Sequence, residues 1–378
     1  MRSIYLDWNA TTPPLPEVLE AVHRTEAEHW ANPSSVHRPG QLARAELDRA
    51  RRSVGALVGC HPRDVVLTGG GTEANNLALR AATGPIVASR LEHPSIIRVV
   101  EALEREGRRV TWVRPLPEGR LVPAEIAVAL ADAGGGGLVC IQAVNHETGV
   151  VQPVAEVVRI AHEAGARVHC DAVQAAGRLG AEHWAGADSI SLAAHKIRGP
   201  KGIGALVVRP GWRIPPVLRG GDQERGIRPG TQSAALAAGF RLAADYARDG
   251  ANRYSLIQGL RNHLEGELEV LGGRHGLRVE RNGDGPRAPH VLNLSFEGWV
   301  GSELCAALDL EGVAASSGSA CSAGTSEPSP VIAAMLGVAR ARSAVRLSLG
   351  EGTTREDVEG ALAAFEEVLN ARRRSAGP

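Results

Sequence analysis

Short apolar runs alternate with amphipathic stretches over most of this chain, and this alternation limits the folds that it can adopt. The apolar runs have the length of strands, whereas the stretches between them have the residue spacing of helices. Such alternation favours an α/β fold, in which a mostly parallel sheet is covered by helices on both faces. The expected strands are Val65–Leu67, Ile86–Ala88, Leu138–Val144, Arg167–Cys170 and Ser189–Leu192, and the expected helices are Glu73–Ala82, Ser95–Glu106, Pro123–Ala131 and Val154–Ala164.

The pattern changes near residue 250, where we place a domain boundary. Before this point we expect a strand over Ile203–Val208 and a helix over Ala234–Arg248, and after it a helix over Tyr254–Leu271. Shorter strands then surround a helix: the strands are Leu277–Glu280, Val291–Phe296, Val313–Ala315 and Val345–Leu349, the helix is Gly301–Leu310, and a last helix starts near Thr354. We therefore expect a large domain over residues 13–250 and a smaller α+β domain over residues 251–378, with residues 1–12 packed near the smaller one.

Composition narrows the class of protein. The 378 residues are 43% hydrophobic and carry no formal net charge, so charge offers no case for binding nucleic acid or an anionic membrane. The five cysteines are Cys60, Cys140, Cys170, Cys305 and Cys321. They lie far apart and show no Cys-x-x-Cys spacing, which argues against a disulfide framework and against a structural zinc site. Neither a signal-peptide apolar region nor a run of 18 apolar residues is present, so we expect a reduced, cytoplasmic, soluble protein without a metal.

Lysine is almost absent from this chain. Only Lys196 and Lys201 occur, five residues apart, whereas the other 40 of the 42 basic residues are arginines. Arginine can replace lysine where only positive charge is needed, but a guanidinium cannot lose its proton and act as an amine nucleophile. The alternative is a compositional bias with two accidental survivors. Because Lys196 follows a predicted buried strand, it is the better candidate for amine chemistry.

Two further sites follow predicted strands. Residues 65–73 read as a strand, a glycine turn and the start of a helix, where a phosphate can bind to unpaired backbone N–H groups. A plain tight turn with Thr72 as N-cap is the alternative. Asp171 directly follows the predicted strand at 167–170, at the sheet edge where open α/β proteins bind ligands. A buried acid needs a cationic partner, which a protonated pyridine nitrogen would provide, although Asp171 could instead cap the next turn.

Two more side chains are candidates for the same site. His93 follows the strand at 86–88 and could face that sheet edge, although a lone histidine is more often a hydrogen-bonding surface residue. Cys321 is surrounded by small residues over 316–324, which predicts an accessible thiol on a pliable loop. A phosphate site, a pyridinium partner and a Schiff-base lysine together are the requirements of pyridoxal 5′-phosphate (PLP).

The chain resembles the cysteine desulfurases of the NifS/IscS group, within the class V aminotransferase branch of fold-type I PLP enzymes. The resemblance is carried, in order along the chain, by the motifs at 5–13, 32–35, 70–77, 92–93, 144–152, 169–174, 194–202, 220–231, 316–324 and 345–350. It implies conversion of L-cysteine to L-alanine, with the sulfur held as a persulfide.

A selenocysteine lyase or an aminotransferase of the same fold is the nearest alternative, but an aminotransferase has no need of Cys321. A Rossmann-type nucleotide-binding protein fits the spacing of Gly69–Gly71 poorly.

The resemblance also implies a role for each site residue. Lys196 would form the Schiff base with PLP, His93 would stack on the ring and move protons, Asp171 would pair with the pyridine nitrogen, and Gln174 would bond the phenolic oxygen. Gly71, Thr72 and His195 would hold the phosphate, together with Thr231 from a second subunit, which implies a homodimer. Asn145 and Arg346 would bind the substrate carboxylate.

Cys321 would accept the sulfur and pass it to an acceptor protein, such as an iron–sulfur scaffold or a tRNA-thiolation enzyme. The sequence departs from the group at Ala193, where many relatives carry a phosphate-binding Ser or Thr, at His146, which replaces a frequent Asn, and at Gly71, which replaces a frequent Ala. The change at Ala193 predicts one fewer phosphate contact.

Overall fold

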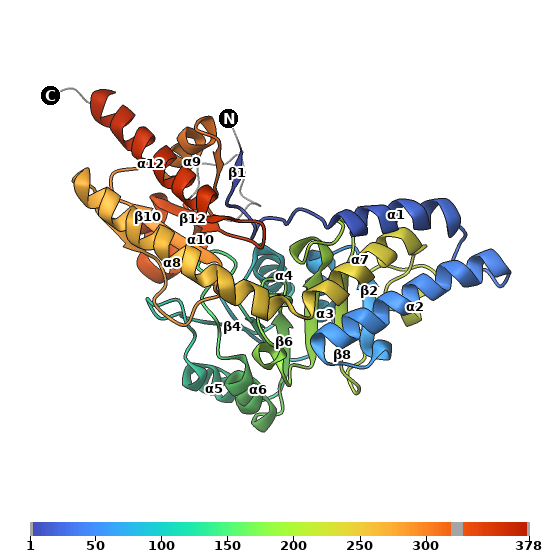
Figure 1. Ribbon diagram of the computed structural model, residues 1–378. Coiled ribbons are helices and arrows are strands. Elements are labelled where there is room, and N and C mark those ends of the chain that lie inside the picture. Colours follow the sequence, from blue (N-terminus) through green and yellow to red (C-terminus); the bar gives the residue numbers. More distant parts are fainter. Residues whose placement is uncertain (1–2, 319–327, 376–378) are drawn as a thin grey trace.

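A seven-stranded sheet forms the centre of the computed structural model, which describes residues 3–318 and 328–375 (Figure 1). The strand order is β2-β8-β7-β6-β5-β3-β4, and only β8 runs against its neighbours. This confirms the predicted mostly parallel sheet. The bounds are β2 Val65–Thr68, β3 Ile86–Ser89, β4 Val110–Val113, β5 Leu138–Gln142, β6 Arg167–Asp171, β7 Ser189–Ala193 and β8 Gly204–Val208.

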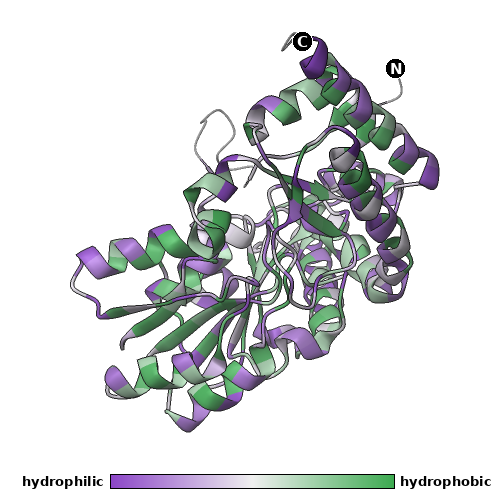
Figure 2. Ribbon diagram, turned by 90° about the vertical axis from the view of Figure 1, so that its left-hand side faces the viewer, coloured by the Kyte–Doolittle hydropathy of each residue, from purple (hydrophilic) through white to green (hydrophobic). Residues whose placement is uncertain are grey.

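In β2, β3, β5 and β8, alternate residues enter two separate apolar cores, one on each face of the sheet. In β5, Val139 and Ile141 join the core beneath one layer of helices, whereas Leu138 and Cys140 join the core on the opposite face. Figure 2 shows the green, apolar strands between these layers. The first layer contains α1 (Pro16–Glu28), α2 (Arg38–Val58), α5 (Pro123–Asp132), α6 (Val154–Glu163) and α7 (Ala234–Ala247), and the second contains α3 (Gly71–Arg80) and α4 (Pro94–Arg105).

A second group of elements has its own apolar core, built around α8 (Gly250–Arg274). Strand β10 (Val291–Phe296) pairs antiparallel with both β9 (Val279–Arg281) and β12 (Ala344–Ser348). The other helices on this core are α9 (Gly301–Leu310) and α12 (Arg355–Ser375). Helices α10 (Pro330–Leu336) and α11 (Val338–Arg342) follow in the same part of the chain, but their buried apolar side chains join the first core. The short 3₁₀ turns are η1 (Pro62–Asp64), η2 (Ala181–Trp184), η3 (Ala194–Lys196) and η4 (Gln223–Gly226). We propose residue 250, where α8 begins, as the domain boundary.

The N-terminal segment joins the two groups of elements. Strand β1 (Ile4–Tyr5) pairs in parallel with β11 (Val313–Ala314), beside α9 and α12 in Figure 1. The chain then crosses to the large sheet, where the N–H of Thr12 donates to the carbonyl of His195 at 3.0 Å. We call residues 6–12 the N-terminal strap. The strap therefore connects the second core directly to the end of β7.

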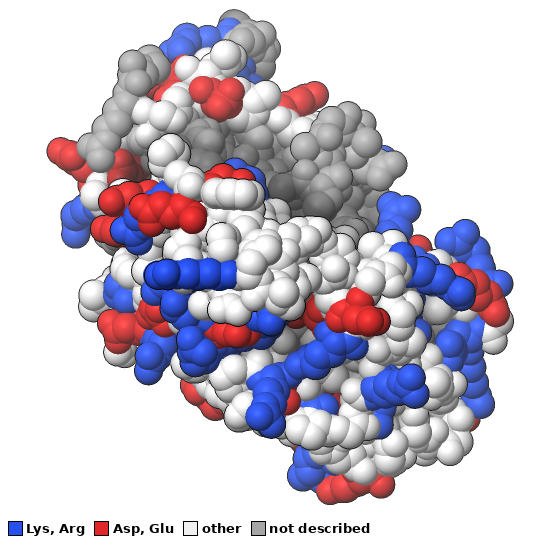
Figure 3. All heavy atoms as spheres, turned by 90° about the vertical axis from the view of Figure 1, so that its right-hand side faces the viewer, with Lys and Arg blue, Asp and Glu red and all other residues white. Residues whose placement is uncertain are grey.

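One face of the molecule shows how its charged side chains are distributed (Figure 3). On the face drawn in Figure 3, acidic and basic side chains are interspersed, as expected for a chain with no formal net charge. No helix within residues 3–318 and 328–375 is both long and apolar enough to cross a bilayer.

The strap depends on a tight contact between Trp8 and Gly350. Trp8 is only 5% exposed, and a Cβ added to Gly350 would lie 1.8 Å from the indole Cδ2. We expect Gly350→Ala to lower the free energy of unfolding by about 1–3 kcal/mol, because the indole must move from a packed site. Urea denaturation with cofactor present measures this change.

Gly352→Ala is the matched control, because its Cβ would meet the same indole at 3.5 Å, an ordinary contact. It should change stability by less than about 0.5 kcal/mol. Equal losses in the two variants would contradict the proposed packing.

Candidate active site

A cavity of about 190 Å³ lies where the carboxyl ends of the parallel strands meet the strap and β12. Parallel strands place their carboxyl ends at one edge, so residues distant in sequence converge there. Eight of the residues predicted from the sequence line this cavity: Gly71, Thr72, His93, Asp171, Gln174, His195, Lys196 and Arg346. Thr231 and Asn145 do not line it, and Cys321 lies outside the described residues.

Asp171 is the last residue of β6 and is buried. Its Oδ2 accepts a hydrogen bond from Nδ2 of Asn75 at 2.9 Å, and its Oδ1 accepts one from the backbone N–H of Val173 at 3.0 Å. No Lys or Arg in the described part of the chain forms an ion pair with this carboxylate. A cationic ring nitrogen in the cavity would supply the missing partner.

Asn75 is held in place by residues that the sequence motifs did not identify as part of the site. Its Oδ1 lies 2.9 Å from Nε2 of His169, whose Nδ1 lies 2.7 Å from the hydroxyl of Ser189. Burial lowers the pKa of His169 to about 4, so the ring is neutral at physiological pH. His169 then donates through Nε2 to Asn75, which turns the amide nitrogen of Asn75 toward Asp171.

His93 forms the cap of helix α4, where Pro94 occupies the first turn. Its Nδ1 accepts the backbone N–H of Ser95 at 3.1 Å and lies 2.8 Å from the hydroxyl of Ser95. Burial lowers the pKa of His93, and the nearby carboxylate of Asp171 opposes that effect. Since Nδ1 accepts, the neutral ring carries its proton on Nε2.

The two lysines have different surroundings. Lys196 follows β7 within the 3₁₀ turn η3, and its Nζ donates to the carbonyls of Asn9 and, at 2.9 Å, Ala10. These carbonyls belong to the strap, which thus holds the amine at the cavity wall. Lys201 is exposed and does not line the cavity. Burial, followed by the charges of the two lysines, lowers the pKa of His195 to about 4.

The glycine turn after β2 leads directly into α3. The helix begins at Gly71, with Gly70 as N-cap and no side-chain capping bond, so Thr72 is not the N-cap and the predicted start at Glu73 is two residues late. A Cβ on Gly71 would lie 2.9 Å from Cγ2 of Val173, so glycine permits this close approach. Within the described part of the chain, the N-cap of α3 therefore supplies no side-chain acceptor, so its first N–H groups can receive a phosphate.

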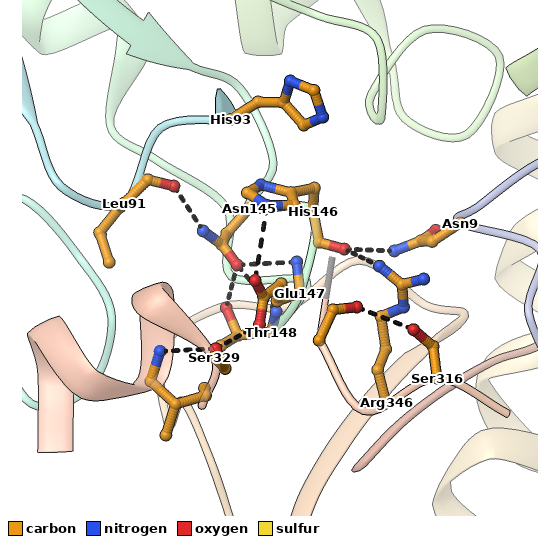
Figure 4. Close-up of polar contacts among 12 residues, drawn as sticks. Asn9, Leu91, His93, Asn145, His146, Glu147, Thr148, Ser316, Ser329 and Arg346 are labelled. Carbon is orange, nitrogen blue, oxygen red and sulfur yellow. Dashed lines mark hydrogen bonds and ion pairs between the residues drawn. The ribbon is translucent and has the colours of Figure 1, made fainter. Parts of the chain in front are cut away.

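Arg346 comes from β12 and lines the cavity, and Figure 4 shows its guanidinium beside the carbonyl of His146. One guanidinium nitrogen lies 2.7 Å from Oδ1 of Asp7, and the other donates to the carbonyl of His146 at 2.9 Å. Its Nε is buried without a hydrogen-bond partner among the described residues. A ligand carboxylate could satisfy this N–H.

Asn145 and His146 are neighbours in sequence, but only His146 is among the residues that line the cavity. The amide of Asn145 is turned away from the cavity, since Nδ2 donates to the carbonyl of Leu91 at 3.0 Å and Oδ1 accepts the N–H of Glu147 at 2.9 Å. His146 lines the cavity instead, with its ring 5.1 Å from that of His93 in an edge-to-face contact (Figure 4). Burial lowers the pKa of His146 well below its ordinary value, so its ring is neutral.

Glu92 is a buried acid directly behind His93. Its Oε1 accepts the backbone N–H of Gln142 at 3.1 Å, and its Oε2 has no hydrogen-bond partner among the described residues. Burial raises the pKa of Glu92 well above its ordinary value, and the charge of Asp171 raises it further. Glu92 therefore holds a proton under conditions where an exposed glutamate has lost it.

Comparison with known proteins gives consistent matches over nearly the whole chain. The family model described as "Aminotransferase class-V" matches residues 4–360. The cysteine desulfurase of Enterobacter agglomerans is 37% identical, covering 100% of this chain and 95% of the relative. Cysteine desulfurase IscS of Anaeromyxobacter sp. (strain Fw109-5) is 40% identical, and the match covers 94% of this chain and 90% of the relative. Among solved structures, a "NifS-like protein" matches with a TM-score of 0.88 and 30% identity over 98% of this chain and 100% of its own.

Replacing Glu92 with Gln should raise the melting temperature, and the gain should grow between pH 5 and pH 8. The carboxyl is protonated in the folded state but ionised in the unfolded state above about pH 4.3, so rising pH favours unfolding in the parent. Gln keeps the acceptor for Gln142 and has no charge to lose. Thermal unfolding at several pH values measures the difference.

The exposed Glu125 of α5 provides the control. Glu125→Gln should shift the melting temperature equally at all these pH values. A gain for Glu92→Gln that is the same at pH 5 and pH 8 would contradict the buried, protonated state of Glu92.

Proposed function

The chain belongs to the class V aminotransferase family, and from that premise we propose which of its residues carry out the reaction of a PLP-dependent cysteine desulfurase. The observation that carries the assignment is that one cavity joins an amine, a carboxylate without a described cationic partner and an uncapped helix N-terminus. These are Lys196, Asp171 and the first turn of α3. They fit the aldehyde, ring nitrogen and phosphate of PLP, respectively.

We assign the cofactor contacts on this basis. Lys196 would hold the cofactor covalently, Asp171 would pair with its ring nitrogen, and Gln174 would donate to its phenolic oxygen. Gly71, Thr72 and His195 would surround the phosphate, and His93 would cover the ring. Ala193 has no hydroxyl, so one phosphate contact found in many relatives would be missing here.

The cysteine substrate would bind through its carboxylate to Arg346. The buried Nε of this arginine has no described partner and the side chain lines the cavity, which supports the assignment. Asn145 remains a weaker prediction for this role, because its amide already bonds Leu91 and the 147–148 backbone. Its bonds hold the turn that places His146 in the cavity wall.

The bound cofactor withdraws electrons from the substrate and thereby acidifies its Cα proton. Lys196 Nζ, once displaced by the substrate amine, would accept that proton. Cys321 thiolate would then attack the substrate sulfur, so that an S–S bond forms while the Cβ–S bond breaks and its electron pair returns to the carbon side. The products are L-alanine and a persulfide on Cys321.

The surroundings of the 319–327 segment support this role for Cys321. Ser316 exchanges backbone hydrogen bonds with Arg346, at 3.1 and 2.6 Å, so the chain enters the segment beside the cavity. The five residues from Ser316 to Cys321 can span about 17 Å at most. This attachment of Ser316 to Arg346 supports the proposal that the thiol of Cys321 serves a substrate bound at Arg346.

We also propose a homodimer in which Thr231 serves the partner's cavity, since it does not line the cavity of its own chain. Large apolar side chains remain uncovered in nearby segments of the large domain: Trp30 is 74% exposed and Val36 85%. Burial of such side chains is a usual contribution of a dimer interface.

The sulfur would pass to an acceptor protein, for which an iron–sulfur scaffold or a tRNA-thiolation enzyme is the proposed identity.

A cytoplasmic location is proposed because the four described cysteines are free thiols, which suit a reducing compartment.

Lys196→Ala should abolish the borohydride-reducible bond between protein and PLP and lower turnover by at least about 10²–10⁴-fold. The reason is that no other amine stands at the cavity wall among the described residues. Reduction with borohydride followed by mass spectrometry of peptides measures the bond. Lys201→Ala is the matched control and should retain it, whereas a reducible bond in Lys196→Ala would contradict the assignment.

Cys321→Ala should keep PLP and still bind cysteine, seen as a change in the cofactor's absorbance, but it should not release sulfur. The expected loss of sulfide formation with a thiol reductant is at least about 100-fold. Cys60→Ala is the control, because burial raises the pKa of Cys60 to about 11 and keeps it a thiol. Sulfide release from Cys321→Ala at the parent rate would refute the persulfide role.

A further inference from the structure

Arg178 is a buried cation without a described acidic partner. It lies between β6 and η2 and is only 1% exposed. Its guanidinium donates to side-chain and backbone oxygens only, and its Nε has no hydrogen-bond partner among the described residues. Burying a guanidinium without a carboxylate is costly, so this placement calls for a reason.

The first contact of Arg178 sets the orientation of Gln174. Nη1 donates to the side-chain Oε1 of Gln174 and, at 3.3 Å, to its carbonyl. With Oε1 engaged as acceptor, the amide cannot flip, and its nitrogen is the end that donates. Nε2 gives one hydrogen to the carbonyl of Asn9 at 3.0 Å and has a second hydrogen for the cavity that Gln174 lines.

The other contacts of Arg178 connect it to the lysine. Nη2 donates to the carbonyl of Lys196 at 3.1 Å and to the carbonyl of Trp8 at 3.3 Å. The ring of Tyr254 lies 5.7 Å from the guanidinium carbon. One side chain thus joins Gln174, the strap and the backbone of Lys196.

We propose that Arg178 is a positioning residue for the cofactor: it presents an N–H of Gln174 to the phenolic oxygen and places a positive charge behind Lys196. The inference rests on the proposed function, because it takes Lys196 as the point of attachment. Arg178 does not line the cavity and acts through these two residues.

Other charged groups near Arg178 and Lys196 do not replace this charge. Arg346 already pairs with Asp7, and burial makes the neighbouring histidines neutral. Among the described residues, the other titratable or charged groups that face this region include Asp7, Asp171, Lys201, Tyr254, Arg346 and the histidines His93, His146, His195 and His290.

The positive charge of Arg178 and the N–H of Gln174 would both lower the proton affinity of the nitrogen that links Lys196 to the cofactor. The nitrogen that links Lys196 to the cofactor is more positive when it holds a proton, so a nearby cation favours loss of that proton. A donor to the phenolic oxygen stabilises its negative charge most once that proton is gone. Removing Arg178 should therefore make the linkage keep its proton to a higher pH.

The test is a pH titration of the visible absorbance band of the holoenzyme without substrate. Arg178→Met should move the midpoint upward by about one pH unit, a tenfold increase in proton affinity. Arg178→Lys restores the charge and should bring the midpoint back toward the parent value. An unchanged midpoint in Arg178→Met would overturn the proposal.

Arg261→Met separates this role from simple loss of a buried arginine. Arg261 is 4% exposed and donates to the carbonyl of Val291 at 3.3 Å, and it does not line the cavity. This variant should lose stability but keep the parent midpoint. If Arg261→Met shifts the midpoint as far as Arg178→Met does, the effect is general and the proposal fails.

Gln174→Leu keeps the test decisive if Arg178→Met does not fold. It removes the presented N–H while leaving the buried charge, and it should also raise the midpoint. No shift in Gln174→Leu would overturn the role assigned to the amide. A parent enzyme without a borohydride-sensitive band would instead contradict the proposed function itself, so the two failures are distinguishable.

Discussion

The contact between the N-terminal strap and the end of β7 is the interaction on which the site depends. Asn9 and Ala10 accept hydrogen bonds from the amine of Lys196, and Thr12 bonds the carbonyl of His195. At its other end, the strap is anchored by Trp8 against Gly350 and by β1 against β11. The position of the amine therefore depends on how the strap packs outside the large sheet.

Burial controls the charges around the cavity. The histidines that line or approach it have lowered pKa values, so they act as neutral donors or acceptors. Glu92 keeps a proton for the same reason. Among the described residues, the charged groups in and beside the cavity include Asp171, which has no ion-pair partner there, the cations Lys196, Arg178 and Arg346, and Asp7, which pairs with Arg346. This balance suits a ligand with a cationic ring nitrogen, an anionic phosphate and a substrate carboxylate.

Much of the large sheet could be predicted from the sequence because its strands are short apolar runs buried on both faces. Helices α1 and α2 were not predicted, although each carries an apolar stripe, because many charged residues obscure it. Strand β5 ends at Gln142, two residues before the predicted end, because the chain turns there to place Asn145 against Leu91. Asn75, His169 and Arg178 were missed as site residues because nothing local marks their partners.

The sequence by itself determined the family, the PLP chemistry and the candidates Lys196, Asp171 and the glycine turn. These signals are local: a rare residue type, or a polar group directly after a buried strand. Only the tertiary structure decided that Arg346 reaches the cavity, that His146 lines it in place of Asn145, and that Arg178 bonds both Gln174 and Lys196. The physical reason is that these roles depend on which groups are left without partners after the chain packs. Packing brings together residues as distant in sequence as Asp7 and Arg346, which are 339 positions apart.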